Sequence, residues 1–283
     1  MSRPLTLAIC QLRWSPDPGR NLEQGLVMAA EGFAGGANVV VLPELAVPGY
    51  TTDPQRLGES AQTLNGPAVK AWQHAAEAGG GYIVGGLCER DGSQLFDSAV
   101  MVSGGGILAS YRKAHLFNGE KRVFTQGDTG FPVVRTAYGT FGICICYDLR
   151  FVEVLRILAL RGAELVLVPS AWVSGFDRGA PATPGLPGQV TGLLVQANLN
   201  QVFAAAASFA GPGPSAPFLG CSVAASPYGD ALAGPAPADA ECVAFAHVDL
   251  DQVAEASQRT LLVTPRKDRR RDLYSVIHLG HEL

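Results

Sequence analysis

Short apolar runs and segments with helical periodicity alternate along the chain from end to end. Residues 5–11 (LTLAICQ) and 38–42 (NVVVL) have the apolar pattern of strands, and between them apolar side chains recur at helical spacing over residues 21–35. The same order returns in the second half, where residues 141–146, 151–161 and 164–169 predict a strand, a helix and a strand. This repeated order predicts an α/β protein with substantial sheet.

The remaining segments continue the pattern without a break between domains. Further helices are expected at residues 68–78, 190–200 and 251–256, and further strands at residues 81–86, 95–102, 107–111, 202–207, 222–225 and 243–248. The Pro- and Gly-rich stretch 179–188 is interpreted as an inserted loop, because structured-looking sequence of the same type continues after it. We therefore expect a single domain over residues 1–283.

Composition and charge narrow the class of protein. The chain has 283 residues, of which 47% are hydrophobic and 16% charged, with a net charge of −4, so it can bury a large core and is not expected to bind nucleic acid. No apolar stretch reaches the roughly 18 residues of a membrane span, and the first residues lack the apolar region of a signal peptide. The six cysteines show neither disulfide-framework nor zinc-ligand spacing. We expect a soluble, cytoplasmic protein with reduced thiols, without a metal or another cofactor.

Polar residues follow three predicted strands, at the ends where α/β folds gather their functional groups. Glu44 follows the run VVVLP, so its carboxylate is expected to be desolvated, which suits a general base; a capping or loop acid is an equal alternative. Lys113 follows the strand at 107–111 among apolar residues, where an ammonium can stabilise an oxyanion, although a lysine that extends to solvent is commoner. His115 is a second candidate partner for a cysteine nucleophile.

The third strand end, FGICICYDLRF (141–151), carries two cysteines. If residues 141–146 form one strand, Cys144 and Cys146 point to the same side, so periodicity does not separate them. Cys144 lies inside the strand and is interpreted as a packed thiol. Cys146 lies at the strand's end, just before the predicted helix 151–161, where the helix dipole and free N–H groups stabilise a thiolate. Cys146 is therefore the candidate nucleophile, with a buried structural thiol as the alternative.

Together these segments resemble the nitrilase superfamily of carbon–nitrogen hydrolases over nearly the whole chain. VVVLPELAVPGY (39–50) is similar to the family's general-base segment, YRKAHLF (111–117) to its lysine segment, and residues 143–172 to its nucleophile segment. DRRRDLY (268–274) resembles a segment near the family's C-terminus. The resemblance implies a four-layer α-β-β-α sandwich that forms a homodimer or a larger homo-oligomer, with residues 263–283 packing on the partner subunit.

The resemblance also implies roles for individual residues. Glu44 would be the general base, Lys113 the cation that stabilises the oxyanion, and Cys146 the nucleophile. Glu120, in HLFNGEKRVF, matches the family's second glutamate and would position both the substrate amide and Lys113. The reaction would proceed through a thioester on the cysteine, which water then hydrolyses.

The residues around the nucleophile bear on the substrate. The backbone N–H of Tyr147 would complete the oxyanion hole, and Tyr50 and Trp172 would contact the substrate. Nitrilases of the family resemble Cys-Trp-Glu at the nucleophile, whereas this chain has Cys146-Tyr147-Asp148, which is similar to the amidase branches. We therefore expect a small-molecule amide as the substrate, hydrolysed to a carboxylic acid and ammonia.

Other functions stay open on the sequence alone. A nitrilase, or an N-carbamoyl-amine or amino-acid hydrolase, of the same superfamily would use the same residues. A Cys–His acyltransferase or peptidase would depend on His115, and a catalytically silent binding module would need none of them. The helix segment QANLN (196–200) lacks the Arg and Glu usual in the family, and the loop 172–188 contains Asp177 and Arg178 among small residues and prolines. These departures favour a small, fairly neutral amide.

Overall fold

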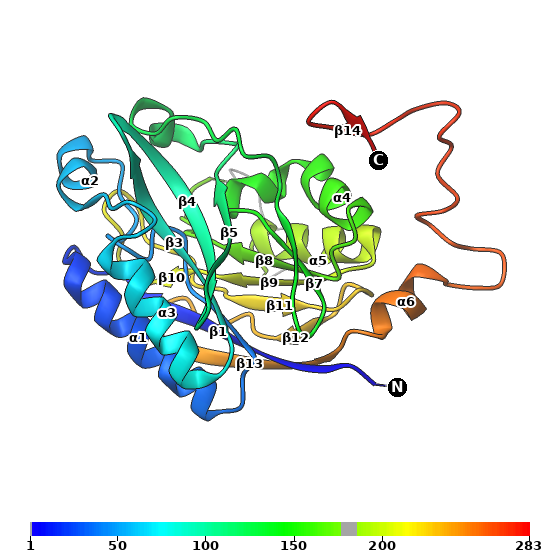
Figure 1. Ribbon diagram of the computed structural model, residues 1–283, viewed down its shortest axis with the longest axis horizontal. Helices are drawn as coiled ribbons and strands as arrows, with labels where there is room; N and C mark the ends of the chain where they lie inside the picture. Colours follow the sequence, from blue (N-terminus) through cyan, green and yellow to red (C-terminus); the bar gives the residue numbers. More distant parts are fainter. Residues whose placement is uncertain (1, 177–185) are drawn as a thin grey trace.

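Strands and helices alternate along the chain in nearly the order that the apolar pattern predicts (Figure 1). The computed structural model describes residues 2–176 and 186–283. In these ranges the helices are α1 (Pro18–Ala34), α2 (Pro54–Ser60), α3 (Pro67–Gly79), α4 (Val152–Leu160), α5 (Gly188–Asn200) and α6 (Gln252–Ser257), with the 3-10 helices η1 (Asn118–Arg122) and η2 (Cys146–Arg150). The strands are β1 (Pro4–Arg13), β2 (Val39–Val41), β3 (Tyr82–Asp91), β4 (Gln94–Ser103), β5 (Gly106–Arg112), β6 (Val133–Arg135), β7 (Thr140–Ile143), β8 (Leu165–Pro169), β9 (Phe203–Ala207), β10 (Phe209–Ala210), β11 (Val223–Ala225), β12 (Ala231–Ala233), β13 (Cys242–Asp249), β14 (Ile277–His278) and β15 (His281–Glu282).

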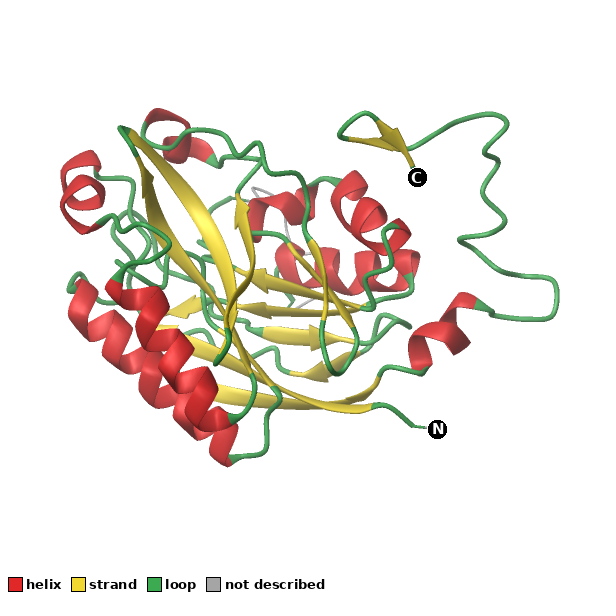
Figure 2. Cartoon of the chain, viewed as in Figure 1, coloured by secondary structure: helices red, strands yellow, loops and turns green. Residues whose placement is uncertain are grey.

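Two sheets lie face to face between two layers of helices (Figure 2). One sheet has the order β10-β1-β2-β3-β4-β5, with β13 also paired to β1, and the other has the order β12-β11-β9-β8-β7-β6. Helices α1 and α3 pack on the first sheet, α4 and α5 pack on the second, and β1 and β2 face β8 and β9 across the interior. The predicted four-layer α-β-β-α sandwich is confirmed.

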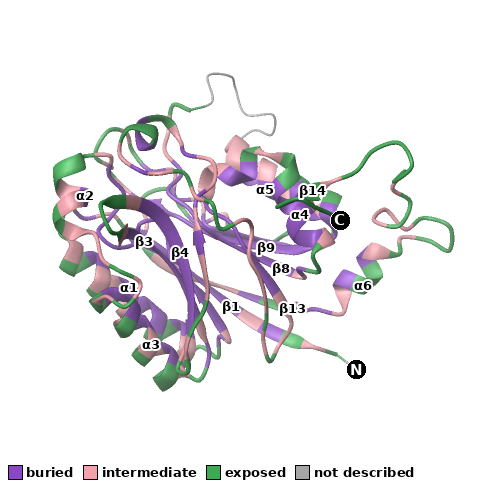
Figure 3. Cartoon of the chain, turned by 45° about the horizontal axis from the view of Figure 1, so that its top comes forward, coloured by how far each residue is buried: buried purple, intermediate pink, exposed green. Residues whose placement is uncertain are grey.

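The central strands are buried on both faces, as their continuous apolar runs indicate (Figure 3). Along β2, Val39 and Val41 belong to the core between the two sheets, whereas Val40 belongs to the core beneath α1 and α3. The side chain of Trp72 on α3 fills much of that second core and is fully buried. Alternate residues of one strand therefore stabilise two different layers.

The largest differences from the predicted elements lie where capping or a turn overrides the apolar pattern. Helix α1 begins at Pro18, ahead of the predicted start, because the Asp17 carboxylate accepts hydrogen bonds from the N–H groups of Gly19 and Arg20. Helix α2 was not predicted, since it is too short for periodicity to show. Most of the predicted inserted loop, with Asp177 and Arg178 before it, lies outside the described residues.

The C-terminal segment leaves the body of the protein after α6 and returns beside α4 at the hairpin β14–β15 (Figure 1). Arg266 holds its first part, donating hydrogen bonds to the carbonyl oxygens of Asn200 at 3.1 Å and Gln201 at 2.6 Å. Further along, Leu273 and Ile277 are exposed apolar residues. The expectation that residues 263–283 pack on a partner subunit stays a prediction. Among the described residues, no helix is both long and apolar enough to cross a bilayer.

Gly86 on β3 allows that strand to approach the loop that carries Glu44. A methyl group at Gly86 would lie 2.7 Å from Glu44 Cα, with no room to move away from the loop backbone. We expect Gly86→Ala to lower the free energy of unfolding by about 1–3 kcal/mol through overpacking, measured by urea denaturation.

The matched control is Gly58→Ala in α2, because a methyl group there meets nothing within 4 Å. It should stabilise the helix slightly, by about 0.5–1 kcal/mol. Equal urea midpoints for the two variants would show that a methyl group at Gly86 is tolerated beside the loop that carries Glu44.

Candidate active site

Glu44, Lys113 and Glu120 meet in the interior of the protein. Glu44 follows β2, Lys113 follows β5 in the same sheet, and Glu120 lies in η1. The Nζ atom of Lys113 donates hydrogen bonds to Oε1 of Glu44 and, at 2.8 Å, to Oε2 of Glu120. All three side chains are buried, so the ammonium depends on these carboxylates in place of water.

Glu120 is anchored by donors from three parts of the chain. The Tyr50 hydroxyl donates to Oε1 at 2.8 Å, and the Phe117 N–H donates to Oε2 at 2.7 Å, in addition to Lys113. Burial raises the pKa of Glu120, while the charge of Lys113 opposes that rise. The carboxylate thus has a fixed orientation and, together with Glu44, holds the Lys113 ammonium.

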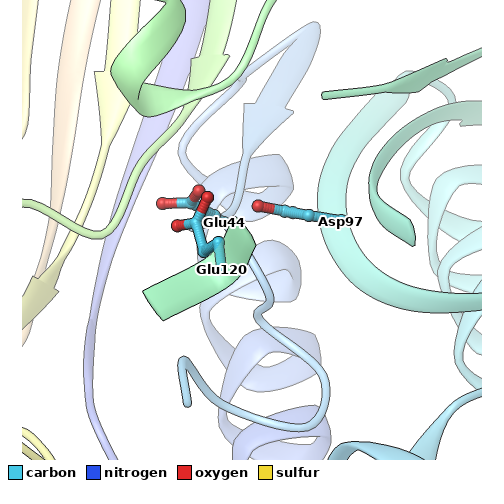
Figure 4. A group of neighbouring side chains, drawn as sticks. All are labelled: Glu44, Asp97 and Glu120. Atoms are coloured by element: carbon cyan, nitrogen blue, oxygen red, sulfur yellow. The ribbon is translucent and has the colours of Figure 1, made fainter. Parts of the chain in front are cut away.

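A third buried carboxyl group, that of Asp97 on β4, adjoins the same ammonium. Its Oδ2 atom lies 3.3 Å from Lys113 Nζ, and its carbonyl oxygen accepts the Lys113 N–H at 2.8 Å. The sequence analysis missed Asp97, although an acid inside the apolar run LFDSAV was a visible signal. Oxygens of Glu44, Asp97 and Glu120 lie within 4.8 Å of one another (Figure 4), a metal-like spacing, but Lys113 already supplies the cation among them.

The predicted strand over residues 141–146, with Cys146 at its end, is wrong. Strand β7 ends at Ile143, and Cys146 is the first residue of η2, with its backbone in the left-handed region at φ 43°. A non-glycine residue in this region is strained, and such strain is concentrated at functional sites. The argument that both cysteines face one side of a strand therefore fails. Cys144 is fully buried in the hydrophobic core, in agreement with its predicted packing role.

The pKa of Cys146 is shifted in the direction opposite to the one expected from a nearby helix. Helix α4 begins only at Val152, so Cys146 does not belong to its first turn, where the dipole acts most strongly. Burial raises the pKa of Cys146 well above its usual value; the charge of Glu44 adds to the rise, while Lys113 and the Ala171 N–H oppose it. At neutral pH the sulfur is a thiol, and it needs a base to become nucleophilic.

Asp148 fixes the turn that carries Cys146. Its carboxylate accepts the Ile145 N–H at 2.9 Å, the Tyr111 hydroxyl at 2.7 Å, and both the N–H and the Nδ1 of His115, at 3.2 and 2.7 Å. Tyr111 and His115 flank Lys113 in the sequence, so this carboxylate ties the lysine segment to the cysteine segment. The sequence analysis did not identify Asp148 as an anchor.

Helix α5 holds the other end of η2. The Gln196 side chain donates from Nε2 to the carbonyl oxygen of Leu149 at 2.8 Å and is itself buried. The segment QANLN, which departs from the usual family pattern, thus has a packing role beneath the η2 turn.

Cys146 lines a small, largely apolar pocket of about 40 Å³. This volume accommodates a few water-sized groups. Tyr50 and Trp172, predicted to contact substrate, both line it, and so does Tyr147. Arg150 brings a charge to the pocket wall, with its guanidinium carbon 4.6 Å from the centre of the Phe176 ring. The other described lining residues are Phe117, Leu149, Ala171, Val173, Gly188, Gln189 and Gly192.

Comparison with known proteins identifies the family of this chain. Residues 6–258 match the model of the carbon–nitrogen hydrolase family. The chain is 33% identical over 260 residues to a nitrilase from Pyrococcus abyssi, covering 91% of this chain and 94% of the relative. It is also 33% identical over 282 residues to an omega-amidase from Danio rerio, covering 95% of this chain and 96% of the relative.

Solved structures show the same fold. An amidase from Nesterenkonia sp. superposes with a TM-score of 0.79 at 27% identity, covering 95% of this chain and 94% of that one. In one mutant of this amidase, with a TM-score of 0.79 at 26% identity and coverage of 95% of both chains, the acetamide moiety of fluoroacetamide is covalently attached to the active-site cysteine. The present chain therefore belongs to the carbon–nitrogen hydrolase family, within the nitrilase superfamily, and is an enzyme that acts on carbon–nitrogen bonds.

Proposed function

We propose that this enzyme hydrolyses a small, uncharged carboxamide to a carboxylic acid and ammonia through a thioester on Cys146. One observation carries the proposal: the buried ammonium of Lys113 donates hydrogen bonds to both Glu44 and Glu120, and Tyr50, which donates to Glu120, lines the same pocket as Cys146. Amide hydrolysis needs proton transfer and stabilisation of an oxyanion, and a carboxylate with an adjacent ammonium supports both.

Acylation begins with proton transfer from the Cys146 thiol to Glu44. The thiolate attacks the amide carbon, and negative charge develops on the amide oxygen. Lys113 and the backbone N–H of Tyr147 stabilise this oxyanion; one such donor is typically worth about 3–4 kcal/mol. Glu44 then gives its proton to the leaving nitrogen, the C–N bond breaks, and ammonia departs from the thioester.

Deacylation uses the same groups on water. Glu44 removes a proton from water, the hydroxide attacks the thioester carbon, and the same donors stabilise the second oxyanion. The C–S bond breaks, the sulfur recovers the proton from Glu44, and the carboxylic acid leaves. Glu120, held by Tyr50 and the Phe117 N–H, keeps Lys113 in position throughout.

The pocket supports a small acyl group. Aromatic and aliphatic side chains, among them Tyr50 and Trp172, dominate its wall, and its volume is about 40 Å³. The Nesterenkonia sp. AN1 amidase has been crystallised with butyramide and with acrylamide, which are amides of this size class. A nitrile or an N-carbamoyl substrate, the alternatives within the superfamily, would meet the same nucleophile.

Replacing the nucleophile tests the proposal directly. We expect Cys146→Ala to abolish ammonia release from butyramide and acrylamide, since no other group in the mechanism forms the thioester. The matched control is Cys144→Ala, two residues away in the core, which should retain turnover. Ammonia release by folded Cys146→Ala would contradict the proposal, and intact-protein mass spectrometry of the wild type should detect the acyl adduct.

The identity of the base is tested by a second pair of variants. Glu44→Gln should lower kcat/KM by about 10²–10⁴, the usual contribution of a general base. His115→Ala should lower kcat/KM by less than about tenfold. The His115 ring is hydrogen-bonded to Asp148 and takes no part in the proposed proton transfers. The reverse order of effects would favour a Cys–His acyltransferase or peptidase over the amidase.

We also propose that residues 263–283 pack on a second copy of the chain. Leu273 and Ile277 support this, since they are 70% and 63% exposed on a segment that leaves the body of the protein. A homodimer would cover them.

Charged residues at these two positions should weaken the assembly. We expect Leu273→Asp combined with Ile277→Asp to shift the sedimentation coefficient from that of an oligomer to that of a monomer. Val27→Asp on α1, a similarly exposed position at 62%, is the control and should not change it. A wild-type protein that sediments as a monomer at micromolar concentration would rule out this proposal.

A further inference from the structure

Asp97 is a buried carboxyl group that lacks the donors an ionised carboxylate needs. Both of its oxygens are buried, and neither accepts a hydrogen bond from the described residues. The ammonium of Lys113 lies 3.3 Å from Oδ2, but its hydrogen bonds are directed to Glu44 and Glu120. A negative charge in this position is strongly unfavourable, because buried charged groups need hydrogen bonds to replace those of water.

Other buried carboxylates show what an ionised group receives in this protein. Asp148 accepts hydrogen bonds from two backbone N–H groups, a tyrosine hydroxyl and a histidine ring. Glu89 accepts the Ser98 hydroxyl at 2.6 Å and a two-pronged contact from Arg112. Glu120 has three donors. Asp97 is equally buried, yet among the described residues it has only the Lys113 ammonium at 3.3 Å and no hydrogen-bond donor to either oxygen.

Counting charges leads to the same conclusion. If all three carboxyl groups around Lys113 were ionised, one positive and three negative charges would leave a net charge of −2 among buried side chains. One additional proton relieves this excess. Glu120 has its three donors and Glu44 has its hydrogen bond from Lys113, so Asp97 is the group that holds the proton.

The carboxyl group of Asp97 points toward that of Glu44 (Figure 4). Glu44 Oε2 is buried and has no hydrogen-bond partner among the described residues, so it offers an acceptor for the proton. One O–H on Asp97 therefore satisfies two carboxyl groups at once.

We propose that Asp97 is a positioning residue for the hydrolysis proposed above, on which this inference rests: it stays a neutral carboxylic acid and donates its O–H to Glu44, orienting the base. The proton stays on Asp97 through the cycle, and no bond to substrate is made. Because a neutral acid attracts the ammonium only weakly, one N–H of Lys113 stays available for the oxyanion.

Burial and the two neighbouring carboxylates favour the neutral form of Asp97, whereas the Lys113 ammonium favours the charged form. Burial raises the pKa of Asp97 well above its ordinary range; Glu44 and Glu120 add to the rise, and Lys113 opposes it. Cys88, which pairs with Asp97 across β3 and β4, brings no charge, since burial raises its own pKa to about 12.

Infrared spectroscopy tests the protonation state without reference to activity. Wild-type protein labelled with ¹³C at the aspartate carboxyl carbons should show the C=O stretch of a buried carboxylic acid at pH 7. The band should be absent from Asp97→Asn. It should persist in the matched variant Asp148→Asn, which removes the other fully buried aspartate of the described residues. A wild-type spectrum without the band, or a band that survives Asp97→Asn, overturns the proposal.

Rescue by the conservative variant tests the positioning role. Asp97→Ala removes the donor to Glu44 and should lower kcat/KM for butyramide by more than about 100-fold. Asp97→Asn, also neutral and also a donor, should lose less than about tenfold. Equal losses in the two variants overturn the proposal, because an ionised Asp97 is not replaced by an amide. Thermal unfolding checks that each variant is folded. If Asp97→Ala does not fold, the proposal is judged on the loss of kcat/KM in Asp97→Asn and on the infrared band.

The outcomes separate this inference from the proposed function. If wild-type protein releases no ammonia from any small amide, the hydrolysis proposal fails while the infrared band still reports the state of Asp97. If hydrolysis depends on Cys146 and Glu44 but the band is missing, only the inference about Asp97 fails.

Discussion

The pairing of one buried ammonium with carboxylates from separate segments is the interaction on which the site depends. Lys113 is fully enclosed, and an unpaired charge there would destabilise the fold by several kcal/mol. Its contacts draw together the loop after β2, which carries Glu44, and the η1 turn, which carries Glu120. The charge that serves the proposed chemistry therefore also fixes where these segments lie, so stability and positioning have one physical origin.

Around this ion pair, hydrogen bonds hold residues whose backbone conformation is strained. Leu45, Asn118 and Cys146 all have positive φ angles. Leu45 follows Glu44, Asn118 lies two residues before Glu120, and Cys146 is the proposed nucleophile. Such conformations persist only where surrounding contacts over-determine them. Asp148 supplies these contacts for Cys146, because its four hydrogen bonds leave the η2 turn little freedom. The proposed reacting groups are thus held in place before substrate binds.

The sequence predicted the layers well and the site's electrostatics poorly, for physical reasons. Apolar periodicity reports burial. The continuous run around Val40 therefore predicted a strand covered on both faces, and the helical spacing of apolar residues over 21–35 predicted most of α1. Periodicity does not report where hydrogen bonding ends a strand, so the end of β7 was placed too late. Charged neighbours come from distant segments, so neither Asp97 beside Lys113 nor the raised pKa of Cys146 could be found from local spacing.

The raised pKa of Cys146 has a consequence for the order of proton transfers in the proposed reaction. A permanent thiolate, as a helix N-terminus would produce, would leave Glu44 without a proton to give to the leaving nitrogen. A neutral thiol passes its proton to Glu44 only as attack begins, so the same proton is available one step later for ammonia. Burial therefore couples activation of the nucleophile to protonation of the leaving group, and a neutral Asp97 preserves that coupling because it holds Glu44 in orientation without adding a competing charge.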